Sequence, residues 1–390
     1  MATQTGYKAS ELGMIPQDWE IRRIGDFAPL QRGFDLPNSE IQSGDYPVVY
    51  SNGIGNYHNC YTVKSPCIAT GRSGTLGKVH YVEQDCWVHN TSLWVTKFDN
   101  CEPKFIYFLF QKIGFERFAS GSGVPTLNRN DAHEFKIALP KSITEQTAIA
   151  TALSDTDALI SSLQTLIAKK QAIKLSAMQN LLSGKIRLPE FAKRPDDLPK
   201  TMYQTELGLL PEDWEVVELG SVAFIKTGSK NNQDKKENGQ YPFFVRSATV
   251  EQIDTYSYDC EAILIPGEGN IGSIFHYING KFDAHQRVYV IRDFYNVIGK
   301  FVFFALKQNF GKHAMENTVK ATVDSLRLPT FQNFKFAIPK STTEQTAIAQ
   351  LLSDMDAEIE ALECRLKKTQ SLKQGMMQAL LTGKIRLPLE

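Results

Sequence analysis

The chain contains the same sequence framework twice. The segment ELGMIPQDWE at residues 11–20 returns as ELGLLPEDWE at 206–215, an offset of 195. The segment LPKSITEQTAIATALSDTDALI, beginning at Leu139, returns as IPKSTTEQTAIAQLLSDMDAEI from Ile338, and GKIRLP returns as well, both at an offset of 199. A constant offset means that this second segment has one fixed length. The repeat predicts two related halves, each a variable block of about 140 residues followed by a constant block of about 45.

The constant block has the start and stop signals of a long helix. Residues 142–145 (SITE) and 341–344 (STTE) fit the S-x-x-E capping box, in which the serine and the glutamate satisfy N–H groups at the helix start. Gly184 and Gly383 suit the left-handed position after a helix end. Between these signals we expect helices of about 40 residues, or roughly 60 Å.

Apolar residues along these two segments recur in steps of four and three, which is typical of a coiled-coil seam. The predicted seam positions are Ile149, Leu153, Ile160, Leu163 and Ile167 in the first copy, and Ile348, Leu352, Met355, Ile359, Leu362 and Leu366 in the second. One small domain cannot bury helices this long, so we expect the two to pack antiparallel, with the variable blocks at opposite ends. Thr156, Lys170 and Lys174 interrupt the first seam, which predicts an imperfect coiled coil with surface left for another partner.

The variable blocks have the pattern of mixed α+β domains. Strand-like runs separated by Gly, Asn and Ser turns occupy residues 46–51, 66–70, 77–82 and 91–98. Each block also has one aromatic-rich helical segment, at residues 103–119 and 299–315, whose aromatic side chains we expect in the core. The predicted fold class is therefore α+β, with two repeated domains joined by two long helices.

Composition narrows the class of protein. Apolar residues make up 42% of the 390 residues and charged residues 22%, as in ordinary globular proteins. Lys plus Arg and Asp plus Glu balance at 43 each, which argues against non-specific coating of nucleic acid but leaves sequence-specific reading open. Without a signal-like N-terminus or an apolar run of about 18 residues, we expect a cytoplasmic protein with no membrane partner. The six cysteines lack zinc-ligand spacing, which predicts free, mostly buried thiols and no metal site.

A glycine-rich segment in the second half fits either a dinucleotide-binding loop or a turn between two strands. Residues 267–272 (GEGNIG) fit the G-x-G-x-x-G of a dinucleotide site, which needs a helix directly after the last glycine. The following residues, SIFHYI, are strand-like, and the matching segment at 71–77 (GRSGTLG) keeps only the last two glycines. We therefore expect a strand-turn-strand with two positions that need glycine geometry.

Signatures of catalysis are weak. The sequence has no G-x-x-x-x-G-K-[ST] loop, no H-E-x-x-H motif and no Asn-Pro-Pro-aromatic run. Of the seven histidines, only His89 and His285 occupy comparable places in the two copies. The chain is predicted to have no catalytic residues and not to be an enzyme.

The variable loops carry polar side chains that suit DNA bases and phosphates. Arginine suits guanine, and asparagine and glutamine suit adenine, through paired hydrogen bonds in the major groove. Singly, each such residue fits a solvated loop, but their recurrence on matched loops of a repeated framework favours DNA reading. The candidates are Arg72, Ser73, Thr75, Asn90, Thr91, Asn128 and Arg129 in the first block, and Arg246, Glu268, Asn270, Gln286, Arg287, Lys320 and Thr322 in the second. Within the glycine loops, we expect Glu268 and Asn270 to differ in target from Ser73 and Thr75.

The doubled pattern P-x-x-x-x-E-Q-x-x-I-A-x-x-L, followed each time by GKIRLP, resembles the specificity subunits of type I restriction-modification systems. The resemblance covers essentially the whole chain. It departs before the second helix, where ENTVKATVDSLRLPTF (316–331) replaces GSGVPTLNRND (121–131), so the counterparts of Asn128 and Arg129 stay open.

This resemblance implies two target recognition domains, each reading one half of a bipartite DNA site, held apart by conserved helices that act as a ruler. It also implies two modification subunits that use S-adenosylmethionine and restriction subunits that use ATP and Mg²⁺, while this chain binds double-stranded DNA and no cofactor. The implied boundaries are recognition domains at 1–141 and 201–340, spacer helices at 142–183 and 341–382, a linker at 184–200 and a tail at 383–390. Two alternatives remain: a coiled-coil scaffold whose α+β modules bind proteins or glycans, and a nucleotide-dependent enzyme built on residues 267–272.

Overall fold

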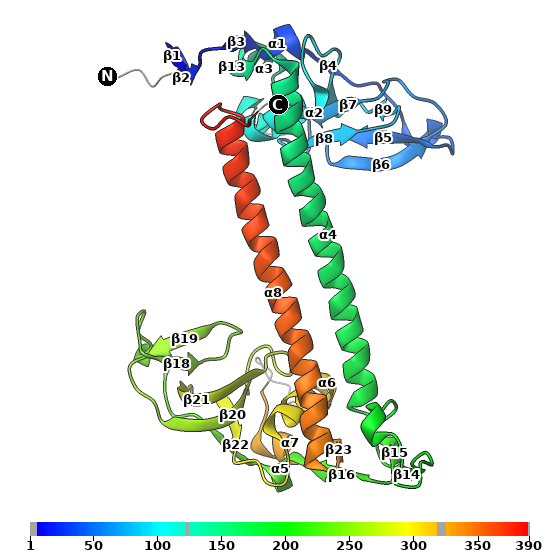
Figure 1. The fold of residues 1–390 in the computed structure, drawn as a ribbon, viewed down its shortest axis with the longest axis vertical. Coiled ribbons are helices and arrows are strands. Elements are labelled where there is room, and N and C mark those ends of the chain that lie inside the picture. The colour runs from blue at the N-terminus through cyan, green and yellow to red at the C-terminus, as the bar shows by residue number, and fades with distance from the viewer. Residues whose placement is uncertain (1–5, 122–124, 318–324, 389–390) are drawn as a thin grey trace. The chain divides into compact units, whose positions relative to one another are not determined.

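The computed structural model describes residues 6–121, 125–317 and 325–388. These residues form two compact units: the first comprises Met1–Thr165 with Cys364–Glu390, and the second Leu166–Glu363. The two long helices, α4 (Ile143–Leu181) and α8 (Thr342–Leu380), each contribute one part to each unit. Strands and helices are mixed in both units, which confirms the α+β prediction (Figure 1).

The remaining elements repeat in nearly the same order in the two units. The first unit contains β1 (Tyr7–Ser10), β2 (Gly13–Pro16), β3 (Trp19–Arg23), α1 (Ile24–Phe27), β4 (Leu30–Arg32), η1 (Asn38–Glu40), β5 (Tyr46–Tyr50), β6 (Gly53–His58), β7 (Cys67–Gly71), β8 (Val79–Val82), β9 (Trp87–Val88), β10 (Ser92–Val95), α2 (Pro103–Ile113), η2 (Phe115–Phe118), β11 (Ala119–Ser120), β12 (Thr126–Leu127), α3 (Arg129–Glu134) and β13 (Lys136–Pro140). The second contains η3 (Pro189–Phe191), β14 (Met202–Thr205), β15 (Gly208–Pro211), β16 (Trp214–Glu218), α5 (Leu219–Val222), β17 (Phe224–Thr227), η4 (Asn232–Asp234), β18 (Tyr241–Phe244), β19 (Val250–Ile253), β20 (Tyr258–Pro266), β21 (His276–Ala284), β22 (Val288–Arg292), α6 (Gly299–Glu316), α7 (Leu328–Gln332) and β23 (Lys335–Pro339).

The main sheet of each unit follows one plan. In the second unit it has six strands in the order β17-β22-β20-β21-β18-β19, because the long strand β21 pairs with β20 and then, in parallel, with β18. In the first unit two shorter strands, β8 and β9, take the place of β21. The sheet is accordingly divided into β4-β10-β7-β8 and β6-β5-β9.

The aromatic-rich helices lie in the cores, as the sequence predicted. Phe105 and Phe108 of α2 are fully buried, and so are Phe301 and Phe304 of α6. These rings pack with other apolar side chains of their own unit in two large clusters. Fully burying a phenylalanine side chain contributes about 1.5–3 kcal/mol each, so the rings stabilise the domains and are not displayed for base stacking.

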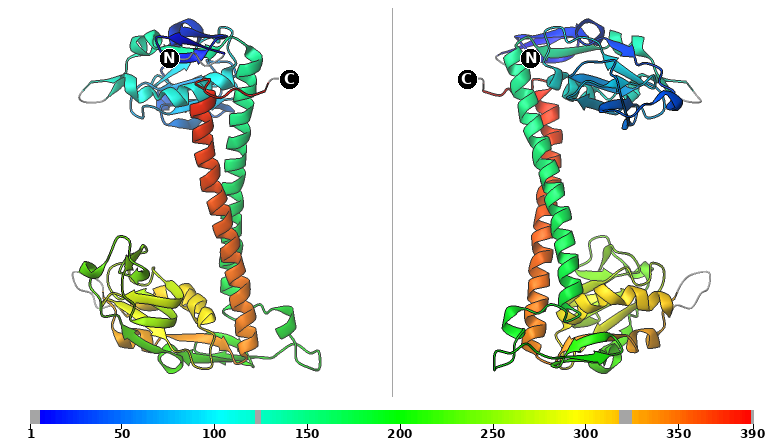
Figure 2. Two further views of the ribbon diagram at one scale, coloured as in Figure 1. Left: turned by 60° about the vertical axis from the view of Figure 1, so that its left-hand side comes forward. Right: turned by 90° about the vertical axis from the view of Figure 1, so that its right-hand side faces the viewer.

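The two long helices pack antiparallel within each unit. In the first unit Lys373 of α8 pairs with Asp157 of α4 at 2.6 Å. In the second unit Lys170 of α4 pairs with Glu358 of α8 at 2.7 Å. A second contact in each unit, Thr156 with Met376 at 3.7 Å and Lys174 with Asp356, shows that the partner's number on α8 falls as the number on α4 rises. Both views in Figure 2 show the end of α8 alongside the beginning of α4 in the first unit.

The predicted seam positions lie on the packed faces. Buried positions are Ile149, Leu153, Leu163, Ile167, Ile348, Leu352 and Ile359, and half-buried ones are Ile160, Met355, Leu362 and Leu366. Lys174, which interrupts the seam, is itself buried and ion-paired with Asp356. The pair Lys373–Asp157 is equivalent to the pair Lys174–Asp356, since both members are related by the offset of 199. Elsewhere on α4, Leu159, Leu166 and Ile173 recur every seventh residue as exposed apolar side chains.

Glycine ends both long helices for two physical reasons. Gly184 has φ of 67° and Gly383 has φ of 68°, the left-handed region that the sequence predicted. A Cβ added at Gly184 would lie 2.8 Å from Cδ of Pro211, and one at Gly383 would lie 2.5 Å from Cγ of Pro16. Both glycines therefore also allow the chain to pass close to the N-terminal hairpin of a repeat.

The capping-box prediction is confirmed for the serine of the first copy and is wrong for the glutamates of both copies. The backbone N–H of Glu145 donates to Oγ of Ser142 at 3.3 Å, as the motif requires. The Glu145 carboxylate, however, accepts from Nη2 of Arg386 at 2.8 Å, and Glu344 accepts from Nε of Arg187 at 2.9 Å. The arginine of each GKIRLP segment thus binds the glutamate at the start of the other long helix. A buried guanidinium–carboxylate bond outweighs a capping bond that water can replace.

Replacing these two arginines should destabilise the chain unequally. The Arg187 side chain is 7% exposed and the Glu344 side chain 1%, whereas that of Arg386 is 34% exposed. Burial already raises the pKa of Glu344 despite Arg187 beside it. Arg187→Ala should therefore lower the free energy of unfolding by about 3–5 kcal/mol, the usual effect of leaving a buried charge unpaired. Arg386→Ala should have a smaller effect in urea unfolding, because its partner Glu145, which is 2% exposed, keeps a hydrogen bond from Nε1 of Trp19 at 3.3 Å. Equal effects of the two substitutions would contradict this assignment.

Candidate nucleic-acid interface

Three loops meet in the first unit and carry most of its candidate residues. They are the glycine loop (72–78) between β7 and β8, the histidine turn (89–92) before β10, and the pre-helix segment (126–128) before α3. The backbone N–H of Arg72 donates to the Thr91 carbonyl at 2.8 Å, and that of Leu127 donates to the Arg72 carbonyl at 2.8 Å. We call this arrangement the three-loop cluster.

The second unit has the same cluster with the same backbone bonds. The N–H of Gly267 donates to the Arg287 carbonyl at 2.8 Å, and that of Leu326 donates to the Gly267 carbonyl at 2.8 Å. An isolated bridge pairs Glu268 with Ser325, as another pairs Ser73 with Thr126 in the first unit. The loops predicted to match therefore do match in space within each domain.

The glycine loop joins two antiparallel strands in both domains. In the second domain β20 pairs with β21, and no helix follows Gly272. Only the two glycines shared by both copies have left-handed φ values, 83° and 81° at Gly74 and Gly77, and 86° and 66° at Gly269 and Gly272. This confirms a strand-turn-strand and contradicts a dinucleotide loop, which would need its third glycine to open a helix. Thr75 and Asn270 lie on these loops, half-buried and exposed respectively.

The histidine turn owes its shape to its histidine. Nδ1 of His285 accepts from the backbone N–H of Arg287 at 3.0 Å, and Nδ1 of His89 accepts from that of Thr91 at 3.3 Å. Burial lowers the pKa of both histidines, so the neutral ring that can accept this bond is favoured. The central positions of the two turns hold four candidates: Asn90, Thr91, Gln286 and Arg287.

A second pair of histidines also matches, so the expectation of only one comparable pair was wrong. His80 and His276 occupy equivalent positions on the hairpins that pair β7 with β8 and β20 with β21. Nε2 of His80 lies 3.2 Å from the Ser51 carbonyl, and Nε2 of His276 lies 3.3 Å from the Ser247 carbonyl. Each holds the loop that follows β5 or β18. Their common sequence signal is His-Tyr within a strand-like run.

The pre-helix segment resolves the counterpart of Asn128. The Oδ1 atom of Asn128 accepts from the N–H of Asn130 at 3.0 Å and caps α3, whose exposed first residue is Arg129. At an offset of 199, the counterpart of Asn128 is Arg327. This exposed residue lies directly before α7 and was not among the predicted candidates. The offset of the helix block, extended backward, would have found it. Lys320 and Thr322 lie outside the described residues.

The charges on the two clusters differ. In the first domain the Asn90 amide donates to the Asp35 carboxylate. In the second, Glu268 pairs with Arg287 at 3.0 Å and with Arg246 at 3.5 Å. Related frameworks thus present different polar groups.

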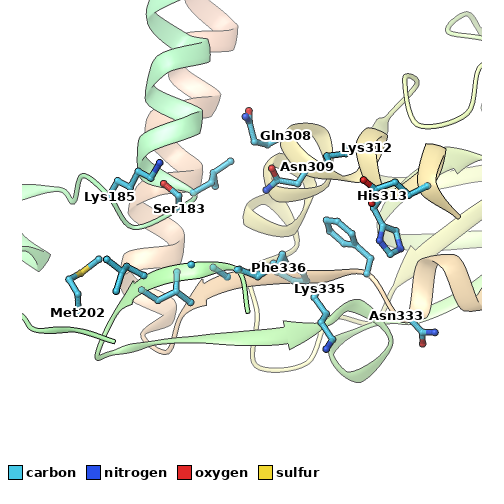
Figure 3. Close-up of a pocket in the computed structure, with 18 residues that line it drawn as sticks. Ser183, Lys185, Met202, Gln308, Asn309, Lys312, His313, Asn333, Lys335 and Phe336 are labelled. Carbon is cyan, nitrogen blue, oxygen red and sulfur yellow. The ribbon is translucent and has the colours of Figure 1, made fainter. Parts of the chain in front are cut away.

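Each unit also has an apolar groove beside its N-terminal hairpin. The groove of the second unit has a volume of about 1000 Å³, and Figure 3 shows Ser183 and Lys185 on one side of it, across from Gln308 and Asn309 of α6. The groove of the first unit, about 330 Å³, is lined by equivalent residues. The shared lining positions include Leu12, Met14, Lys112, Arg117, Lys136 and Lys384 in the first unit and Leu207, Leu209, Gln308, His313, Lys335 and Lys185 in the second.

The cysteines, possible metal sites and possible membrane-spanning helices can also be compared with the predictions. All six cysteines are free, but only Cys67, Cys86 and Cys101 are buried, so the expectation of mostly buried thiols was too strong. Within the described ranges, no group of three or more His, Cys, Asp and Glu side chains could hold a metal ion. Among the helices of the described residues, none is both long and apolar enough to span a bilayer.

Comparisons with known proteins agree with this repeated architecture. The model of the type I restriction modification DNA specificity domain matches residues 16–174 and again 211–370. The specificity subunit of the type I restriction enzyme EcoDI from Escherichia coli is 35% identical over 45% of this chain, and this match spans only 38% of that relative. The MjaVIII specificity subunit of Methanocaldococcus jannaschii is 24% identical over 96% of this chain and 94% of its own.

A solved structure has the same fold. The S subunit of a type I restriction-modification system from M. genitalium matches with a TM-score of 0.69 over 95% of this chain and 97% of its own, at 17% identity. The two family matches together cover well over half of the chain and coincide with its two repeats. The chain belongs to the family of type I restriction-modification specificity subunits.

Proposed function

We propose that each domain reads one half of a bipartite double-stranded DNA site with its three-loop cluster. The observation that carries this proposal is the contrast between framework and side chains. The same backbone bonds hold the loops in both domains, while Thr91 is replaced by Arg287 and Asn128 by Arg327. A rigid frame with exchangeable polar side chains is what selective contact with base edges requires.

The long helices suit the role of a spacer between the half-sites. Each has 39 residues, which at 1.5 Å per residue corresponds to about 58 Å. Paired charges and buried apolar side chains hold α4 and α8 in register within each unit, and this packing opposes bending. The gap between the half-sites would then follow from helix length.

The chemistry belongs to partner subunits in this proposal. The chain would bind no cofactor itself, while modification subunits use S-adenosylmethionine, and restriction subunits use ATP and Mg²⁺. The hairpin at residues 267–272 supports this division, because its backbone has no helix N-terminus for a nucleotide phosphate. With a net charge of zero, this chain would also rely on its partners for part of the phosphate contact. A subunit that reads DNA in this way would act in the cytoplasm.

The twin grooves fit two copies of one modification subunit. Leu12 and Met14 are 47% and 48% exposed at the first groove, and Leu207 and Leu209 are 46% and 58% exposed at the second. Basic side chains at the grooves include Lys384 in the first and Lys185 in the second, whereas Lys136 and Lys335 already pair with Glu11 and Glu206. An apolar segment with carboxylates, supplied once by each of two modification subunits, complements both grooves.

A charge placed in either groove should remove one modification subunit. Met14→Glu and Leu209→Glu each put a carboxylate on an exposed apolar position, so each variant should retain one copy, and the double variant none. Native mass spectrometry of the purified complex measures this stoichiometry. Val250→Glu, at a 42% exposed position on β19 outside the grooves, is the control and should keep two copies. Two copies in all variants would refute docking at the grooves.

The DNA-reading proposal is tested by the methylated motif of cells that carry the complete system. Replacing one recognition domain should change the motif. If the methylated motif stayed the same after the replacement, DNA reading by this chain would be excluded and a scaffold role favoured.

A further inference from the structure

Three charged side chains lie together in the second domain, two of them on the three-loop cluster and the third, Arg246, on the neighbouring loop. Arg246 follows β18, Glu268 lies on the glycine loop and Arg287 on the histidine turn. Oε1 of Glu268 lies 3.0 Å from Nη1 of Arg287, and Oε2 lies 3.5 Å from Nη1 of Arg246. Each carboxylate oxygen therefore faces a different guanidinium. The arginine side chains remain 57% and 50% exposed, so both can still meet a ligand.

The first domain has three hydroxyls at the equivalent positions. Strand register relates Val49 to Phe244, because β5 pairs in parallel with β9 as β18 pairs with β21. Counting on from these strands relates Ser51 to Arg246, whereas the contacts of His80 and His276 relate Ser51 to Ser247. With the count from the strands, Ser51, Ser73 and Thr91 are the counterparts of Arg246, Glu268 and Arg287. The N–H of Ser51 lies 3.4 Å from Oγ1 of Thr91, so these hydroxyl residues also sit together. The same framework thus carries a charged triad in one copy and a neutral one in the other.

A surface that held only phosphates would gain nothing from Glu268. A carboxylate beside the DNA backbone repels it, and here it also neutralises two arginines that could each bind a phosphate. In base reading the same carboxylate is useful, because it fixes both guanidinium forks before DNA arrives and accepts from the amino group of cytosine. Arginine donates two parallel hydrogen bonds to O6 and N7 of guanine, an arrangement that lysine cannot reproduce.

We propose that Arg246, Glu268 and Arg287 read a G·C base pair in the second half-site. Arg287, the more exposed arginine, donates to O6 and N7 of guanine. Glu268 positions both arginines and accepts from N4 of the paired or adjacent cytosine, and Arg246 holds the second carboxylate oxygen. This inference rests on the proposed function and adds to it the base pair read by this domain.

The test is the motif methylated by the complete system, determined by sequencing modified DNA. The motif of the wild-type system should contain a G·C pair in the half assigned to residues 201–340. Arg287→Lys keeps the positive charge and removes the fork, so other bases should be accepted at that pair, with discrimination reduced roughly 10- to 100-fold. Glu268→Gln should relax the same position. Thermal melting of the purified variants verifies that they remain folded.

Two control variants make the result specific. Thr91→Ala, at the counterpart of Arg287, should alter preference only in the first half-site. Lys235→Ala removes an exposed, ion-paired lysine elsewhere in the second domain and should leave every base of the methylated motif unchanged.

Two results would overturn the inference: a second half-site without a G·C pair, or an Arg287→Lys variant that weakens methylation of all sequences alike, as loss of a phosphate contact would. Failure of the underlying DNA-reading function looks different, because the motif would then not respond to exchange of the whole domain.

Discussion

Exchanging residues 201–339 for the same segment of another specificity subunit will change one half of the methylated motif and leave the other half and the gap unchanged. The exchange begins before β14 and ends with β23, so the paired strands β16 and β23 move together and no sheet is divided. All loops of one three-loop cluster lie inside the segment. The physical reason for a change confined to one half is that the other cluster keeps every one of its own backbone bonds.

The donor segment must keep the contacts that anchor the domain to the long helices. Asp213 accepts from Nη1 of Arg187 at 2.7 Å, and Pro211 packs against Gly184. Burial opposes ionisation of Asp213, but hydrogen bonds from Arg187 and Lys200 lower its pKa to about 2. The reciprocal exchange of residues 6–140 is the matched control and should change the other half. If either exchange altered both halves, the two domains would not be independent readers.

Lengthening both long helices by seven residues will lengthen the gap while the recognised bases stay the same. The insertions belong between Asp157 and Lys169 in α4 and between Glu358 and Lys373 in α8, because Asp157 pairs with Lys373 and Lys170 with Glu358. Seven residues preserve the seam, since its apolar positions repeat every seven. The added rise is about 10 Å, the length of about three base pairs. We expect a gap longer by about one to three base pairs, because the DNA must also rotate to present both half-sites.

An insertion in α4 alone is the control for this experiment. It would shift Lys174 away from Asp356 and move seam residues out of register, so methylation should fall sharply. Sequencing of modified DNA again supplies the readout. A double insertion that methylates the original motif with its original gap would rule out the helices as the ruler.

Much of the fold was accessible from the sequence because its signals are local or repeated. The step of four and three apolar residues identified α4 and α8, which begin and end within about two residues of the predicted bounds. The glycines common to both copies identified the turns of the β7–β8 and β20–β21 hairpins, because among the glycines of these two loops they are the ones with φ values that other residues avoid.

The candidate site was only partly accessible. The two copies of the glycine loop and the histidine turn align by eye, and the structure brings them together in each domain. Arg327 was not predicted because the sequence before α7 differs from that before α3, and Lys320 and Thr322 were the candidates in this segment instead. The sequence predicted Arg246, Glu268 and Arg287 only as separate candidates. Their spacing along the chain does not reveal that both arginines contact Glu268.

The sequence by itself determined that this protein has two related halves, two long helices and two matched sets of loops. Helix caps, heptads and glycine turns depend on neighbours within a few residues, so they can be recognised along a line. Only the tertiary structure decided which distant groups meet. Glu145 binds Arg386 across 241 residues of sequence, when the local pattern assigned its carboxylate to its own helix cap. Burial decides between such partners, because a carboxylate removed from water must take the strongest donor within reach.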